Sequence, residues 1–394
     1  MARHSSTFTS LLRTLLLTAS LALLSPTLIA PAQAGPSGPN QCIAFDASWN
    51  LLAFNFDSKD SLIPSTAFSS SSSSAVTTTD ITKPSGRPPF DQTSSPPLCY
   101  TSQFTNAIYV LNADAADPSS VYIFDATASS WSKQQTTLPD VSATTLRGYD
   151  VNGGFQTILD RDTNVFYALT RGNLLMSLDM GLLKAANATA LTWNEVQKPV
   201  WNSNPESEGS GSGLEGYEFP TMALAQNHVH FVGGVPGLKE GEAKIFVIHY
   251  SYLQPSPQSY PSNSGSGAAF PTSHGRTASF FRDDSVQTQF AYIPDDGSAA
   301  YVVDVTANST TPLPGPPAKD AYAVYAASPS VLVQLASEGG KLSYVVYDQE
   351  KHQGASGWKS VDGWKGAIVT TTRPVACELS PGSRSQQWLE SLGW

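Results

Sequence analysis

The sequence is poor in charge and in cysteine, and it lacks the common nucleotide-binding and metal-binding motifs. Charged residues make up 14% of the 394-residue chain, against about 25% in ordinary soluble domains. It contains no glycine-rich phosphate loop, no nucleophile elbow and no spaced cluster of zinc ligands. Beyond the N-terminal region no apolar run is long enough to cross a bilayer. Without these motifs, the chain cannot be assigned to the nucleotide-binding, serine-hydrolase or zinc-finger proteins. Without a long apolar run, we predict no membrane span.

The balance of charge argues against a polyanionic partner. The formal net charge is -10 at pH 7. The first 34 residues carry two cations, Arg3 and Arg13, and no acid, so the chain without them carries -12. A chain of this charge does not bind nucleic acid or anionic membranes through bulk electrostatics.

The N-terminus has the order of a secretory signal. Its cations come first, the apolar core Leu15–Leu24 follows, and Ala32-Gln33-Ala34 supplies a small-x-small cleavage site. We predict a signal peptide over residues 1–34 and a mature chain that is released to the extracellular space or associated with the cell wall. The alternative is an N-terminal membrane anchor, which the short core and Pro26 disfavour.

One pattern recurs along the chain: a short apolar run, often with a tyrosine, then an aspartate, then a tryptophan several positions later. It is complete in Val121–Asp125 with Trp131, Met176–Asp179 with Trp193, and Tyr344–Asp348 with Trp358, and partial in Ala300–Asp304 and Ile245–Tyr250. The β-branched and aromatic residues of these runs predict strands. The recurrent aspartates, Asp125, Asp179, Asp304 and Asp348, are interpreted as turn residues.

Two further apolar runs precede each of these strands, and a polar segment follows it. Glycine- and aspartate-rich turns between the runs predict hairpins. Five four-stranded units fit between Leu98 and Trp364, at roughly 45 to 65 residues each. Because one small sheet buries little surface alone, such units must stack around an axis. The sequence therefore predicts an all-β fold, a single β-propeller of four-stranded antiparallel blades.

The two ends of the chain are predicted to share a sixth blade. Cys42–Asp46 with Trp49 repeats the pattern and is assigned as a third strand, and Leu51–Phe56 is assigned as the fourth. Ala367–Thr370 and Val375–Leu379 are assigned as the first and second strands. A blade built from both termini would close the ring and remove its free edges. This predicts six blades, with seven as the runner-up, in a domain over residues 35–379 followed by a tail over 380–394.

The chain holds three cysteines, which predict one disulfide in an oxidising compartment. The predicted closure places Cys42 and Cys377 on neighbouring strands, so we expect these two to be bonded and Cys99 to be free. A Cys42–Cys99 bond is the alternative, because sequence alone does not fix the connectivity. Two sequons predict N-glycosylation at Asn187 and Asn308.

A resemblance to a known family supports the fold. Val121 to Pro139, VYIFDATASSWSKQQTTLP, resembles the third and fourth strands of a kelch repeat, and Gly233-Gly234 and Gly339-Gly340 resemble the kelch double glycine after the second strand. The resemblance covers most of the mature chain and implies the fold of the kelch and galactose-oxidase-type propellers, without implying their activities. The signal and the low-complexity tracts are also similar to those of secreted fungal proteins.

Three long insertions indicate where function lies. They are Asp57 to Pro97, Trp201 to Gly216, and Gln254 to Gly275. Each is predicted to connect the last strand of one blade to the first strand of the next, which would crowd all three onto one face, where binding residues concentrate. The predicted binding residues are Trp201, Glu206, Glu208, Glu215 and Tyr217. The alternative is that the insertions are disordered or O-glycosylated spacers.

Candidate catalytic chemistry is sparse. His228 and His230 share one face of a strand, which suits metal binding, but an ordinary strand with two partly buried imidazoles is favoured because the sequence shows no spaced third ligand. Kelch-type copper radical oxidases, which the resemblance brings in, need a cysteine-linked tyrosine, and Cys99 is the candidate thiol. Glycoside cleavage needs paired carboxylates. The acidic candidates for such a pair are Glu206, Glu208, Glu215 and Glu218.

The hypothesis favoured by these features is a secreted binding propeller that holds an extracellular glycan or protein at the long-loop face. The alternative is a carbohydrate-active enzyme, a glycoside hydrolase or a copper radical oxidase, on the same fold, and a structural glycoprotein of the cell wall is a third option. No cofactor is predicted. Nucleic acid is not an expected partner.

Overall fold

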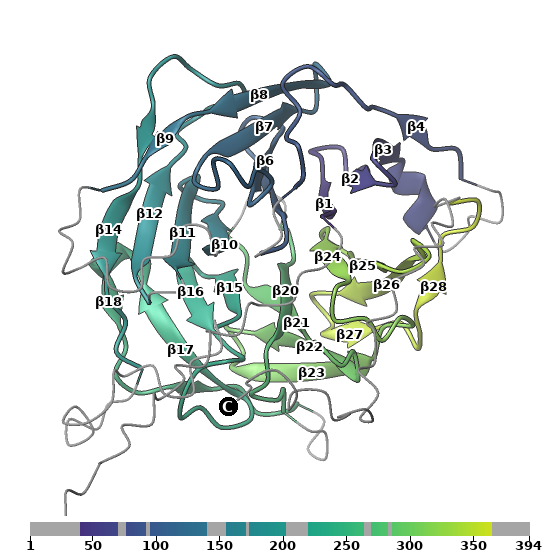
Figure 1. The fold of residues 1–394 in the computed structure, drawn as a ribbon. Helices are drawn as coiled ribbons and strands as arrows, with labels where there is room; N and C mark the ends of the chain where they lie inside the picture. The colour runs from purple at the N-terminus through teal and green to yellow at the C-terminus, as the bar shows by residue number, and fades with distance from the viewer. Residues whose placement is uncertain are drawn as a thin grey trace, which may run out of the picture. The chain divides into compact units, whose positions relative to one another are not determined.

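The computed structural model describes residues 40–69, 76–91, 95–139, 155–170, 173–201, 220–263, 269–282 and 286–364. These residues form six small antiparallel sheets, which we call blades, arranged around a central axis (Figure 1). The prediction of an all-β, six-bladed propeller is confirmed.

The strands follow one another outward from the axis in nearly every blade. Blade 1 contains β1 (Cys42–Phe45), β2 (Leu51–Phe56), β3 (Lys59–Ile63) and β4 (Thr79–Asp80). Blade 2 contains β5 (Leu98–Ser102), β6 (Ala107–Leu111), β7 (Val121–Asp125) and β8 (Ser130–Gln134). Blade 3 contains β10 (Phe155–Asp160), β11 (Val165–Thr170), β12 (Leu175–Asp179) and β14 (Asn194–Gln197).

The second half of the ring repeats this order. Blade 4 contains β15 (Met222–Ala225), β16 (His228–Phe231), β17 (Glu242–Val247) and β18 (Tyr252–Leu253), with β19 (Gln258–Ser259) also on β17. Blade 5 contains β20 (Gly275–Ser279), β21 (Gln289–Pro294), β22 (Ala299–Asp304) and β23 (Ser309–Pro314). Blade 6 contains β24 (Val324–Ala327), β25 (Val331–Leu335) and β26 (Leu342–Asp348), with β27 (Gln353–Gly354) and β28 (Lys359–Ser360) both on β26. The remaining elements are the parallel pair β9 (Thr136–Thr137) and β13 (Leu191–Thr192), and the 3₁₀ turns η1 (Ser65–Phe68) and η4 (Ile248–Tyr250).

The core lies between the blades. Side chains alternate along a strand, so each blade offers one apolar face to each neighbour. In β2, Leu51 and Ala53 pack against blade 6, whereas Leu52 and Phe54 pack against blade 2. Six apolar clusters result, one between each pair of neighbouring blades, including blades 6 and 1. Burial on both faces explains why the inner strands read as continuous apolar runs.

The recurring pattern marks the third strand of a blade, as predicted. β7, β12, β22 and β26 each occupy that position. In each of these blades the aspartate at the strand end accepts a backbone N–H of the following turn. Asp125 Oδ1 accepts the N–H groups of Thr127 at 2.8 Å and Ala128 at 3.0 Å, and Asp304 Oδ1 makes the same two bonds. The interpretation of these aspartates as turn residues is confirmed.

The prediction that both termini share one blade is wrong. Cys42–Phe45 is the innermost strand of blade 1, and residues 42–80 fill all four strand positions of that blade. Ring closure rests on contact of β1 with β24 and on the apolar cluster between blades 1 and 6. The segments 367–370 and 375–379 lie outside the described residues.

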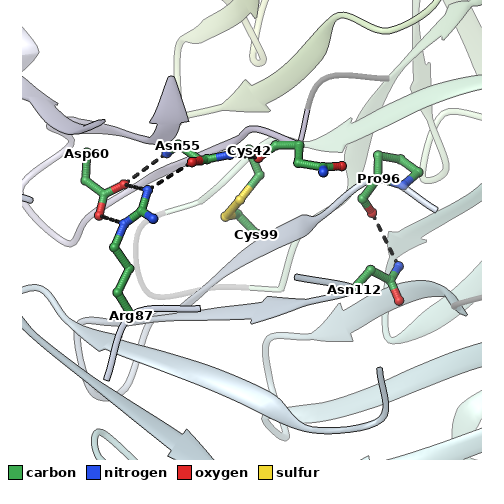
Figure 2. Close-up of a disulfide and its surroundings, with 8 residues drawn as sticks. Cys42, Asn55, Asp60, Arg87, Pro96, Cys99 and Asn112 are labelled. Carbon is green, nitrogen blue, oxygen red and sulfur yellow. Dashed lines mark hydrogen bonds and ion pairs between the residues drawn. A yellow bond between two sulfur atoms is a disulfide. The ribbon is translucent and has the colours of Figure 1, made fainter. Parts of the chain in front are cut away.

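The predicted Cys42–Cys377 disulfide is also wrong, and the alternative is correct. Cys42 of β1 is bonded to Cys99 of β5, with the two Cα atoms 5.7 Å apart (Figure 2). The reason is that β1 and β5 are the innermost strands of neighbouring blades and contact each other. Cys377 lies outside the described residues.

The insertion from Asp57 to Pro97 is largely part of blade 1. It contributes β3 and β4, and its Ile81 and Phe90 are buried between blades 1 and 2. Arg87 anchors it through two bonds to the buried carboxylate of Asp60, Nε to Oδ2 and Nη2 to Oδ1, each 2.8 Å long (Figure 2). Its described residues are therefore a packed segment and not a solvated spacer.

Candidate functional site

The innermost strands of the six blades surround a narrow central channel. In addition to the ladder hydrogen bonds within each blade, side-chain hydroxyl groups donate hydrogen bonds from one blade to its neighbour. Ser279 Oγ donates to the Leu224 carbonyl at 2.8 Å, Thr221 Oγ1 donates to the Gly275 carbonyl at 3.2 Å, and Thr101 donates to the carbonyl of Phe45. These bonds satisfy backbone carbonyls that have no strand partner on the axial side. They hold the channel wall in place.

One cavity lies where the innermost strands begin, which is also where the connections from one blade to the next arrive. We call it the entrance cavity and this side of the propeller the entrance face. The cavity has a volume of about 90 Å³ and is lined by Tyr100, Arg276, Tyr322 and Tyr325, beside the Cys42–Cys99 disulfide. Its lining thus combines aromatic rings, hydroxyls and one cation. Such a mixture of apolar surface and a few polar groups is typical of ligand sites.

Arg276 is the charged residue of the entrance cavity lining. Its Nη2 donates to the carbonyl of Ala321 at 3.2 Å. Burial lowers the pKa of the guanidinium, and the nearby carboxylates of Asp295 and Asp320 oppose that shift. Neither carboxylate lies within ion-pair distance, and the residues described for this chain supply no other ion-pair partner. Most of its five N–H donors are therefore available to a ligand.

The tyrosines of the cavity are fixed by neighbours. Tyr325 accepts a bond from Gln334 Nε2 at 2.9 Å, and burial raises its pKa. Tyr100 donates its hydroxyl to the Thr157 carbonyl, and burial raises its pKa to about 12. Tyr322 has its backbone N–H held by Asp320 Oδ1 at 2.9 Å. The hydroxyls of Tyr100 and Tyr325 therefore stay neutral at physiological pH and present hydrogen-bonding groups without charge.

A charged groove adjoins the entrance cavity. It has a volume of about 460 Å³ and shares Tyr322 with the cavity. Lys319, Asp320, Glu338 and Lys341 line it, so both signs of charge are represented. A ligand larger than the entrance cavity can extend along this groove over blade 6.

Of the predicted binding residues, the structure describes Trp201. Trp201 is 2% exposed, its Nε1 donates to Asn173 Oδ1 at 2.9 Å, and its ring packs edge-on against Phe231. It is therefore a core residue between blades 3 and 4. Glu206, Glu208, Glu215, Tyr217 and Glu218 lie outside the described residues.

His228 and His230 lie in β16, where His228 is partly exposed and His230 is buried. His230 is 2% exposed and packs against the rings of Tyr260 and Phe290. Each histidine Nδ1 lies near a backbone carbonyl two residues before it. Within the part of the chain that the structure describes, no three His, Cys, Asp or Glu side chains gather as a metal site. His230 therefore has the surroundings of an aromatic packing position.

Burial of His230 predicts a dependence of stability on pH. Burial is the main reason that the pKa of His230 falls from 6.5 to about 3, and the nearby His228 adds to the shift. Between these values the unfolded chain binds more protons than the folded one, so stability decreases as the pH falls through this window. We expect a contribution of roughly 1.4 kcal/mol per pH unit there.

The variant His230→Phe should not show this decrease of stability with falling pH, because a phenyl ring fits the aromatic surroundings and does not titrate. Urea unfolding of wild type and variant at several pH values between the two pKa values measures it. As the pH falls from 6.5 toward 3, the wild type should lose stability relative to the variant, so the difference between the two profiles should change with pH. Parallel profiles would show that His230 does not titrate on unfolding.

Two further predictions concern modification and redox chemistry. Asn187 and Asn308 are both exposed, so both sequons are accessible.

Cys99 is bonded to Cys42, which removes the thiol that a cysteine-linked tyrosine would need. Cys99 is therefore not the free thiol that the copper radical oxidase alternative takes it to be.

The sheet order defines a six-bladed β-propeller with cavities among its innermost strands. No protein-family model matches the chain, and no curated protein matches it. None of the helical segments described in the structure is long and apolar enough to span a membrane.

Proposed function

We propose that this chain is a secreted binding propeller that holds an extracellular glycan or protein at the entrance face. The observation that carries the proposal is the entrance cavity with its three tyrosines and Arg276. Aromatic rings and arginine are the side chains most enriched at the centres of recognition sites. The adjoining groove extends the site to one side and supplies charged groups for a larger ligand.

The composition of the cavity supports binding in preference to hydrolysis. Among its described lining residues there is one cation and no carboxylate. Glycoside cleavage would need two carboxylates facing the same bond. The cavity itself supplies no such pair, and release of soluble products from a bound glycan would favour the alternative in which carboxylates such as Glu206, Glu208, Glu215 or Glu218 cleave it.

The proposal is tested by binding of the mature protein to a panel of extracellular glycans and cell-wall polysaccharides, with soluble products measured in the same samples. The variant Tyr322→Ala should weaken binding of each positive ligand by about tenfold, because the ring belongs to both the cavity and the groove.

The matched control is Tyr250→Ala. Tyr250 is 82% exposed and lies in the connection between the third and fourth strands of blade 4, on the opposite face. This control should bind like the wild type. Equal loss in both variants, or loss only in the control, would place the ligand away from the entrance cavity.

A further inference from the structure

A second cavity lies at the other end of the channel, where the innermost strands end. We call it the rear cavity; its volume is about 60 Å³. Apolar side chains make up most of its lining, among them Phe45, Phe281 and Ala327. Arg161, which directly follows β10, is the one charged residue in this lining.

Arg161 is held in a fixed position by blade 5. Its guanidinium carbon lies 3.4 Å from the centroid of the Phe281 ring, and Nη1 donates to the Ser279 carbonyl at 3.2 Å. The Trp49 ring packs edge-on against Phe281, with the centroids 5.0 Å apart. The cation therefore rests on an aromatic platform that is itself supported by blade 1. This arrangement fixes the plane of the guanidinium.

The two acids beside Arg161 in the sequence do not neutralise it. Asp160 accepts bonds from Thr163 Oγ1 at 2.6 Å and from the N–H of Asp162 at 3.3 Å. Asp162 Oδ2 accepts from Asn227 Nδ2 at 2.9 Å. Among the residues described, no carboxylate forms an ion pair with Arg161. One of its five N–H donors is used by Ser279, and the others have no protein acceptor there.

An unpaired cation that is partly buried, as Arg161 is, is unfavourable unless an anion joins it. Burial lowers the pKa of Arg161 to about 9, so the guanidinium is still charged at neutral pH. The rear cavity offers a space for the missing anion directly beside the charge. A guanidinium binds a carboxylate through two parallel N–H···O bonds, with geometry that fits its planar fork.

We propose that the rear cavity binds a small monocarboxylate, of the size of acetate to butyrate, with its carboxylate on Arg161 and its short alkyl group against the apolar wall. One cation matches a single negative charge, whereas a phosphate dianion needs several free donors, and the hydroxyls of Thr101 and Ser279 in this lining already donate to backbone carbonyls. The volume admits a few non-hydrogen atoms and excludes a sugar ring. The argument for this site does not rest on the ligand proposed for the entrance face, although Tyr100 and Tyr325 belong to the linings of both cavities.

The test uses the mature protein with acetate, propionate and butyrate, and with chloride and inorganic phosphate at matched ionic strength. Saturation-transfer NMR detects the carboxylates directly on the wild type, and thermal unfolding measures the stabilisation that a ligand of the folded state provides. Propionate should bind and raise the melting temperature. Chloride and phosphate should raise it less.

Two variants distinguish binding of propionate at the rear cavity from binding at the entrance cavity. Arg161→Gln should reduce the affinity for propionate by about tenfold or more, whereas Arg276→Gln at the other end of the channel should bind propionate like the wild type. If Arg161→Gln does not fold, Arg161→Lys keeps the charge and loses the planar fork, and it should bind propionate more weakly.

Three results would overturn the proposal: no saturation transfer on the wild type, equal propionate affinity in wild type and Arg161 variants, or binding of phosphate as strong as that of propionate. Loss of glycan or protein binding at the entrance face would not affect it. Conversely, a failure to bind carboxylates would leave the entrance-face proposal intact.

Discussion

Replacing both Cys42 and Cys99 with serine is expected to lower the free energy of unfolding by about 4 kcal/mol. The two residues are separated by 57 positions in the sequence, and the chain-entropy relation for a loop of that length gives about 4 kcal/mol. The bond also links the innermost strands of blades 1 and 2 beside the entrance cavity. Denaturant unfolding of the oxidised wild type and of the double variant, followed by tryptophan fluorescence, measures the difference.

The matched control is Cys377→Ser, which removes the cysteine that has no part in the observed bond. It should leave both stability and the number of disulfides unchanged. Mass spectrometry after thiol alkylation should find one free thiol in the wild type and none in the control. A control that loses as much stability as the double variant would contradict the Cys42–Cys99 assignment.

Arg87→Ala is expected to lower the free energy of unfolding by about 3 kcal/mol, because it leaves the Asp60 carboxylate buried without its cation. Asp60 is 0% exposed, and both of its oxygens accept from the guanidinium at 2.8 Å. The same guanidinium donates to Asn55 Oδ1 at 3.1 Å and lies over the Phe90 ring. Its loss would therefore also loosen the segment that closes blade 1 against blade 2.

An exposed ion pair provides the comparison. Lys351 and Asp348 are 2.7 Å apart, with side chains 74% and 39% exposed. Because solvent screens such a pair, Lys351→Ala should change the stability far less than Arg87→Ala. The double variant Asp60→Asn with Arg87→Ala should recover part of the loss, since it removes the stranded charge. Equal effects of Arg87→Ala and Lys351→Ala would show that the Asp60–Arg87 pair does not stabilise blade 1.

The blade pattern could be predicted from the sequence because it is local. A strand that ends in Asp125 or Asp304 is followed by a turn whose N–H groups the same aspartate binds, so strand and turn are encoded together. The same local signal caused the error in blade 1. Asp46 accepts the N–H groups of Ser48 and Asn50, each at 2.8 Å, and Trp49 follows, yet this turn joins the first strand to the second.

The disulfide and the channel could not be predicted in the same way because they depend on neighbours in the ring. Cys99 meets Cys42 only because both lie on innermost strands of adjacent blades. Arg161 and Arg276 follow or begin an innermost strand, and no local pattern shows that they face the axis. The sequence offers one signal for them. The acidic chain has only 22 Lys and Arg residues, and these two each adjoin a predicted first strand.

The predicted long-loop site shows the limit of reasoning from composition. Trp201 has the residue type expected at a binding surface, but its indole N–H is bound by Asn173 and its ring lies in the core. Whether the Trp201 side chain is exposed depends on how blades 3 and 4 pack together, and this packing cannot be inferred from composition. The entrance cavity instead draws on Tyr100, Tyr322 and Tyr325, which come from two blades at opposite ends of the described chain.

The most direct test of the account is a hydrogen–deuterium exchange footprint of the mature protein with the tightest ligand from the glycan and protein panel. Binding at the entrance face predicts slower exchange in residues 96–100, 276–277 and 320–325, which line or border the cavity and groove. Exchange in the turn around Tyr250 should not change. Protection confined to the opposite face, with unchanged exchange at these three segments, would contradict the proposed location of the site.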